Sequence, residues 1–149
     1  RKDMDMPDNN GNRIMGWLIK SPFGKLMGES LAVITVTGRK TGRLISTPIN
    51  VARKGDVFTT TSTRERTWWR NLRGGASADL HVGGRDYRVT AAVYESNEEV
   101  KLKLGEYCRN YPRAARFLKV HIHEDGNPEE SSLAAAAAER VVIELRLLN

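Results

Sequence analysis

The feature that most constrains the fold is a series of short segments rich in Val, Ile and Thr, separated by glycine-containing turns. β-Branched residues favour strands, and glycine supplies the backbone freedom that tight turns need. A basic turn at 38–43 follows the first segment, and hairpin turns are predicted at 54–56 and 83–84. The strands are predicted at 33–37, 44–52, 57–62, 78–82, 85–94 and 141–147.

Helices are predicted between these strands. Residues 62–65 have the pattern of a capping box, so a short helix is expected to follow and to end at Gly74. Pro48 has no backbone N–H, so its strand is expected to be an edge or to bulge there. Together these signals predict an α+β fold, a small closed or split barrel of about six mainly antiparallel strands with inserted helices. The other helical segments are predicted at 98–109, at 117–121 (helix or strand) and, capped by Ser131 or Ser132, through 134–138.

The length of 149 residues predicts a single domain, 1–149. Residues 1–20 are expected to be a tail that ends in a short amphipathic helix, which caps the barrel or touches a membrane surface. No apolar run is long enough to cross a bilayer. One cysteine, Cys108, excludes an internal disulfide framework and favours a reducing compartment. We therefore expect a cytoplasmic protein, with peripheral membrane contact through the N-terminal helix as an open alternative.

Positive charge is concentrated in the middle of the chain. Residues 39–73 hold nine Lys or Arg against Asp56 and Glu65, a net charge of +7, whereas the whole chain carries +6. A local field of this kind attracts an anion such as a phosphate, a carboxylate or nucleic acid. The turn 38–43 lies at the start of this window, and its glycines allow several N–H groups to converge on an anion. The turn lacks the Walker A pattern, which makes nucleotide hydrolysis a poor explanation.

No constellation of protein side chains in the sequence indicates catalysis without a cofactor. His121 and His123 share a strand face, but no third metal ligand is indicated, and Cys108 is expected to be packed in the interior. Tyr107 and Tyr111 are either packing residues or donors of a proton beside a redox cofactor. The chemistry is therefore expected to come from a bound cofactor.

Three motifs together resemble the deazaflavin-dependent nitroreductase family, split β-barrels related to FMN-binding oxidoreductases. They are Thr-Gly-Arg-Lys-Thr-Gly at 37–42, Thr-Pro at 47–48 and Trp-Trp-Arg-Asn-Leu at 68–72, and the resemblance spans about residues 30–118. It implies coenzyme F420, an 8-hydroxy-5-deazaflavin with a phosphate and a polyglutamate tail. It also implies hydride transfer to a small acceptor.

The resemblance also implies roles for individual residues. The basic turn would hold the phosphate or tail, the second and third strands would lie along the ring system, and the aromatic helix would complete the groove. Ser62 and Tyr111 are the candidate catalytic residues. The candidate coenzyme-binding residues are Arg39, Lys40, Thr41, Gly42, Arg43, Thr47, Pro48, Thr60, Thr61, Ser62, Trp68, Trp69, Arg70 and Asn71.

The sequence therefore predicts an F420H2-dependent reductase that acts on a small conjugated, quinone or nitro acceptor. Three alternatives stay open: an FMN-binding oxidoreductase of the same fold, a nucleic-acid-binding module that uses the basic patch, and a coenzyme carrier without catalytic activity. Binding to nucleic acid would weaken steeply with salt. We expect a small-molecule substrate and no nucleic acid partner, and the sequence leaves the oligomeric state open.

Overall fold

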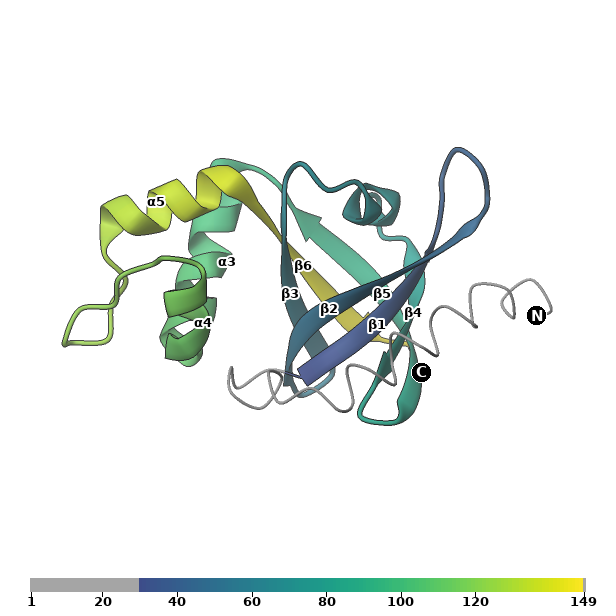
Figure 1. The fold of residues 1–149 in the computed structure, drawn as a ribbon, viewed down its shortest axis with the longest axis horizontal. Coiled ribbons are helices and arrows are strands. Elements are labelled where there is room, and N and C mark those ends of the chain that lie inside the picture. Colours follow the sequence, from purple (N-terminus) through teal and green to yellow (C-terminus); the bar gives the residue numbers. More distant parts are fainter. Residues whose placement is uncertain (1–29, 149) are drawn as a thin grey trace.

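The computed structural model describes residues 30–148, which form a six-stranded antiparallel barrel with helices packed on one side (Figure 1). The predicted α+β split-barrel architecture is confirmed. The elements in chain order are β1 (Ser30–Thr37), β2 (Leu44–Lys54), β3 (Val57–Thr63), the 3-10 helix η1 (Trp68–Leu72), β4 (Ser77–Val82), β5 (Arg85–Tyr94), α3 (Asn97–Asn110), α4 (Pro112–Phe117), α5 (Glu130–Glu139) and β6 (Arg140–Leu147).

The strands close in the order β1-β2-β3-β6-β5-β4, so the last strand of the chain inserts between β3 and β5. Alternate side chains of each strand point inward, as the two-residue period of a strand requires. The interior is filled by apolar residues from all six strands together with the indole rings of η1, including Ile34, Phe58, Leu80, Ile143 and Leu145. The loops at Gly55 and at Gly83–Gly84 adopt positive φ, which explains glycine at these hairpin turns.

A second apolar cluster lies between the outside of the barrel and α3, α4 and α5. Val142 faces outward from β6 into this cluster, where it meets Leu104 and Leu133 from the helices. Ser96 caps α3 by accepting a hydrogen bond from the Glu99 N–H at 3.1 Å. Because the helices cover only one side of the barrel, its opposite end, where the β1–β2 turn projects, stays clear of them (Figure 1).

The barrel wall opens between β2 and β3. β2 pairs with β1 from Leu44 to Val51, but it pairs with β3 only from Ala52 to Lys54. Beyond that point β3 continues along β6 up to the pair Thr63–Arg140. Pro48 lies in the part of β2 that has no β3 partner, which agrees with the expectation that its strand is locally an edge.

Three local predictions are wrong. Residues 62–65 do not cap a helix, because Ser62 and Thr63 belong to β3 and η1 begins at Trp68 without a side-chain cap. Neither Ser131 nor Ser132 caps α5, whose N-cap is Glu129. Residues 117–121 are neither a separate helix nor a strand, since Phe117 ends α4 and the following residues form a turn.

Two other predictions are not tested by the structure. The N-terminal helix at 12–20 lies outside the described residues, as do the rest of 1–29 and Asn149, so the single-domain boundaries 1–149 stay a prediction. Among residues 30–148, none of the helices is long and apolar enough to cross a membrane.

Candidate functional site

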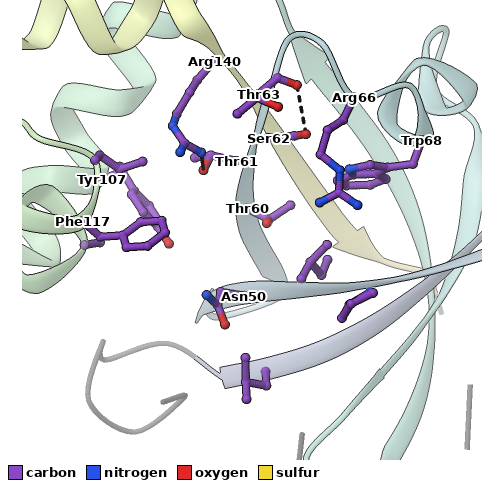
Figure 2. A pocket seen from close by; sticks show the side chains of 15 residues that line it. Asn50, Thr60, Thr61, Ser62, Thr63, Arg66, Trp68, Tyr107, Phe117 and Arg140 are labelled. Carbon is purple, nitrogen blue, oxygen red and sulfur yellow. Dashed lines mark hydrogen bonds between the residues drawn. The ribbon is translucent and has the colours of Figure 1, made fainter. Parts of the chain in front are cut away.

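A cavity of about 310 Å³ lies where the barrel wall opens (Figure 2). Strands β2 and β3 provide one side through Pro48, Asn50 and residues 60–63. The β3–η1 connection contributes Arg66, and η1 contributes Trp68. The remaining side comes from Tyr107 of α3, the α4 region with Ala114, Phe117 and Leu118, and Arg140 at the start of β6. The cavity therefore has a hydroxyl-rich floor between two walls that carry aromatic rings and cations.

The hydroxyl-rich floor is provided by β3. Thr60 and Ser62 are buried, whereas Thr61 and Thr63 are partly exposed. The Ser62 hydroxyl donates to the carbonyl oxygen of Thr63 at 3.1 Å, as the dashed line in Figure 2 shows. These residues lack a β2 partner yet remain paired to β6, so they keep a fixed backbone while their side chains face the cavity.

Two buried polar atoms on the cavity residues have no hydrogen-bond partner within the described part of the chain. They are Nε1 of Trp68 and Oδ1 of Asn50. An unsatisfied buried donor or acceptor costs roughly 1–3 kcal/mol, so such atoms are rare in a finished protein interior. Both atoms belong to residues that line this cavity, which makes a polar molecule bound there a candidate partner for them.

The basic turn at 38–43 is held by its own backbone. The N–H of Gly38 donates to the carbonyl of Arg43 at 2.7 Å, and the N–H of Gly42 donates to the carbonyl of Gly38 at 2.8 Å. The N–H of Arg43 donates to the Thr41 hydroxyl at 3.2 Å. A Cβ at position 38 would lie 3.1 Å from that hydroxyl oxygen and 3.3 Å from the Arg43 carbonyl oxygen, and Gly42 has φ of 72°, so the turn disfavours a side chain at either position.

Asn71 joins this turn to η1. Its Oδ1 accepts the N–H of Arg39 at 3.0 Å, and its Nδ2 donates to the carbonyl of Trp68 at 3.2 Å. Four backbone N–H groups of the turn, those of Gly38, Arg39, Gly42 and Arg43, therefore already have partners in the protein. Only the backbone N–H groups of Lys40 and Thr41 are then left to bind an anion, fewer than the sequence predicts. Most of the attraction for an anion therefore comes from the charged side chains of the turn.

The +7 window of the sequence does not form a single patch. Arg73 forms a two-point ion pair with Glu95 at 2.8 Å, and its hydrogen bond holds the pKa of Glu95 below its usual value. Arg64 donates to the carbonyls of Ala137 and Ala138 at the end of α5. Arg53 and Lys54 belong to the hairpin at the far end of β2. The cations of this window that have no ion-pair partner among the described residues and lie at the turn are Arg39, Lys40 and Arg43.

The structure brings five of the predicted coenzyme residues together on the cavity: Pro48, Thr60, Thr61, Ser62 and Trp68. The turn residues Arg39, Lys40, Thr41, Gly42 and Arg43 lie apart from it, connected through Asn71 and Trp68. Thr47 is buried, and Trp69 packs in the barrel interior with its Nε1 donating to the carbonyl of Thr63. Arg70 donates to the carbonyl of Arg64 and lies over the Trp69 ring.

Tyr111, predicted to be catalytic, does not line this cavity. It lines a second cavity of about 320 Å³ between α3 and the outer faces of β3 and β6. Tyr107 lines both cavities, and its ring lies 5.2 Å from that of Tyr111. The catalytic role of Tyr111 thus stays a prediction, and Tyr107 is the tyrosine on the cavity that holds the other predicted residues.

Sequence reasoning missed several cavity residues. Asn50 could have been found, because it shares a strand face with Pro48 at the two-residue period. Arg66 is counted in the charge of residues 39–73, but the sequence does not indicate that it lies on the cavity. Phe117 and Arg140 had no usable signal, since their placement depends on how α4 and β6 pack against β3.

The lone cysteine is accounted for by packing. Cys108 is buried, and desolvation raises the pKa of its thiol to about 11, so it is held in the neutral form. No group of three or more His, Cys, Asp and Glu that could bind a metal occurs in the range 30–148.

Comparison with known proteins identifies the family. Residues 19–119 match the F420H(2)-dependent quinone reductase family, which is more than half of the chain. The chain belongs to this family. Membership makes it an F420-dependent oxidoreductase with coenzyme F420 as its cofactor, which confirms the enzyme class and the cofactor predicted from sequence. No curated protein matches the chain with significance.

Two solved structures with TM-scores above 0.5 support the fold of this F420H2-dependent quinone reductase family member, and a third is similar at a lower score. A protein of unknown function from Agrobacterium tumefaciens is 15% identical over 89% of this chain and 59% of its own, with a TM-score of 0.54. A putative pyridoxamine 5'-phosphate oxidase from Listeria innocua is 12% identical over 93% of each chain, with a TM-score of 0.51. An F420 reductase is 14% identical over 87% of this chain and 95% of its own, with a TM-score of 0.49.

Proposed function

We propose that this protein reduces a small conjugated acceptor, such as a quinone, an enone or a nitro compound, with F420H2 as the hydride source. The observation that carries the proposal is the cavity between β2 and β3, with its two unpartnered polar atoms and its link to a cationic turn. Membership in the F420H2-dependent quinone reductase family supports the coenzyme, and its name favours a quinone among the acceptors.

The described residues fit the coenzyme in two respects. The polar and aromatic cavity suits a ring system with several hydrogen-bonding groups, and the turn suits an acidic tail. Lys40 and Arg43 are exposed cations at the turn without an ion-pair partner in the described range. In this proposal the turn binds the phosphate or polyglutamate tail, and Pro48, Thr60, Thr61, Ser62 and Trp68 lie along the ring system.

The remaining predicted residues position the turn and the cavity wall without lining the cavity. Asn71 positions the turn against η1, Trp69 and Thr47 fill the wall next to the cavity, and Arg70 steadies the connection that leads to η1. Reduced F420 supplies a hydride when bound. Reduction of a quinone to a hydroquinone also needs a proton, and Ser62, on the cavity, and Tyr111, on the second cavity, are the proposed donors.

The test is a fluorescence titration of the purified protein with oxidised F420. Lys40→Ala and Arg43→Ala are each expected to weaken binding by about 1.5–3 kcal/mol, because each removes a charge-assisted contact. Arg85→Ala is the matched control, since Arg85 is an exposed cation at the opposite end of the barrel from the turn. Oxidation of F420H2 by menadione, followed by absorbance, then tests hydride transfer.

The possible results separate the alternatives. If Lys40→Ala and Arg43→Ala both bind oxidised F420 with wild-type affinity, the turn is not part of the coenzyme site. Binding of FMN in place of F420, seen from its different absorption bands, favours the FMN-dependent alternative. Binding of nucleic acid that weakens steeply with salt, without oxidation of F420H2, refutes the assignment as a reductase.

A further inference from the structure

Arg140 is a cation on the cavity that neither the sequence motifs nor the family match covers, because that match ends at residue 119. It is the first residue of β6 and directly follows α5. Its backbone pairs with Thr63, and Figure 2 shows its side chain reaching toward Thr61 inside the cavity. Its position therefore depends on the pairing of β6 with β3.

The guanidinium of Arg140 makes few contacts for a partly buried group. Nη1 donates to the Thr61 hydroxyl at 3.3 Å, and the guanidinium carbon lies 6.0 Å from the centroid of the Phe117 ring. No carboxylate of residues 30–148 lies within ion-pair distance of it. Desolvation lowers the pKa of Arg140, with Glu139 acting in the opposite direction.

The residues that line the cavity include two arginines, Arg66 and Arg140, and no Asp or Glu. A charge taken out of water is costly unless a counter-charge or good hydrogen bonds compensate for it. A guanidinium offers a fork of N–H donors, of which the Thr61 bond uses one. The unused donors of Arg140 thus suit an electron-rich oxygen on a molecule inside the cavity.

The two arginines lie on different sides of the cavity. Arg66 lies with Trp68 on the side of η1, whose Asn71 contacts the basic turn, whereas Arg140 lies toward Tyr107 and Phe117 (Figure 2). If the coenzyme tail binds at the turn, as in the proposed function on which this inference rests, the side formed by Arg140 and the two rings is left for the acceptor. Tyr107 and Phe117 present flat faces that suit a conjugated ring.

We propose that Arg140 binds an oxygen of the acceptor, a carbonyl or ring oxyanion of a planar conjugated molecule, and so selects quinone-like substrates. The planar fork of Arg140 orients that oxygen, and Phe117 and Tyr107 contact the ring. In this proposal the contact adjusts acceptor choice, because Arg140 lies on the side of the cavity away from Arg66 and Trp68.

The probe is 2-hydroxy-1,4-naphthoquinone, a planar ring with an ionised oxygen at neutral pH. Its binding is measured by calorimetry on protein loaded with oxidised F420, which has no hydride to transfer. Arg140→Met removes the charge at similar side-chain length and is expected to weaken binding about tenfold to a hundredfold. Arg140→Lys keeps a charge but lacks the fork, so an intermediate loss is expected. Arg146→Met, an exposed cation on the same strand but outside this cavity, is the control and should bind normally.

Affinity for oxidised F420 should fall much less than naphthoquinone affinity in Arg140→Met and Arg140→Lys, because the turn that holds the coenzyme tail is untouched and Arg140 reaches the coenzyme side only through Thr61. Unchanged naphthoquinone affinity in the folded variants overturns the proposal, as does a loss confined to F420 or shared equally by both ligands. If Arg140→Met does not fold, Arg140→Lys decides by the same criteria. A protein that does not bind F420 refutes the proposed function instead, and the naphthoquinone titration of the unloaded protein still tests Arg140.

Discussion

Asn71 offers a direct test of how the basic turn is positioned. Its side chain accepts the Arg39 N–H at 3.0 Å and donates to the carbonyl of Trp68 at 3.2 Å. The first bond joins residues 32 positions apart, so it holds the β1–β2 turn against η1. Asn71→Ala removes both bonds and leaves the charges of the turn intact.

The expected cost follows from the two bonds. A typical intramolecular hydrogen bond contributes about 0.5–1.5 kcal/mol net. Water can replace Asn71 at the exposed N–H of Arg39, whereas the bond to the Trp68 carbonyl is partly buried. Asn71→Ala should therefore lower the free energy of unfolding by about 1–2 kcal/mol. F420 binding should weaken as well, because a turn that is no longer held in place must be ordered when the ligand binds.

Urea unfolding gives the stability, and fluorescence titration with oxidised F420 gives the affinity. Asn127→Ala is the control, since the side chain of Asn127 donates to Asp125 in a loop remote in sequence from the turn. A double-mutant cycle with Arg43→Ala then distinguishes positioning from direct contact. If Asn71 acts through the turn, Arg43→Ala costs less in the Asn71→Ala background, with a coupling of at least about 0.5 kcal/mol. Wild-type affinity in Asn71→Ala, or an additive cycle, refutes this reasoning.

Two further predictions concern titrating groups outside the cavity. Burial raises the pKa of the Cys108 thiol to about 11, so native protein at pH 8 should react with iodoacetamide far more slowly than urea-unfolded protein; equal rates would show that the thiol is accessible. The hydrogen bond from Arg73 lowers the pKa of Glu95, so this carboxylate stabilises the fold fully above its ordinary value of 4.5 and progressively less as the pH falls through its folded pKa. In thermal unfolding, Glu95→Gln should therefore be less stable than wild type at pH 7, and the difference should shrink as the pH falls below 4.5. A difference that stays constant with pH would contradict the ion-pair explanation.

The strands were predictable because their signals are local. Alternation, β-branched residues and glycine turns located every strand to within three residues at each end, and the motifs at 37–42 and 68–72 indicated the family. The capping-box prediction at 62–65 failed because tertiary pairing overrode a local pattern. β6 pairs with β3 through Thr63, and the N–H of Arg64 still bonds to the carbonyl of Glu139 at 3.0 Å, so a helix cannot begin there.

The composition of the cavity was only partly predictable. Pro48, Thr60 and Ser62 follow from the family resemblance, and the strand period extends the prediction to Asn50. Arg140 could not be found in this way, because its hydrogen bond to Thr61 spans 79 positions and exists only after β6 inserts beside β3. The charge of the 39–73 window likewise misled, since a count along the chain cannot show that Arg53 and Lys54 lie at the far end of β2 from the turn.

The same β-sheet topology that hides Arg140 from the sequence also explains why the site lies where it does. A fully paired barrel with an aliphatic interior leaves no room for a ring of coenzyme size. Here β2 follows β1 over residues 44–51 and leaves β3, so residues 60–63 face an opening instead of a neighbouring strand. β6 holds the other edge of β3 and brings Arg140 to its end. The β3–β6 pairing thus holds residues 60–63 in place and also positions Arg140. Substitutions that disturb this pairing near Thr63 should therefore alter acceptor binding, even where they leave the basic turn unchanged.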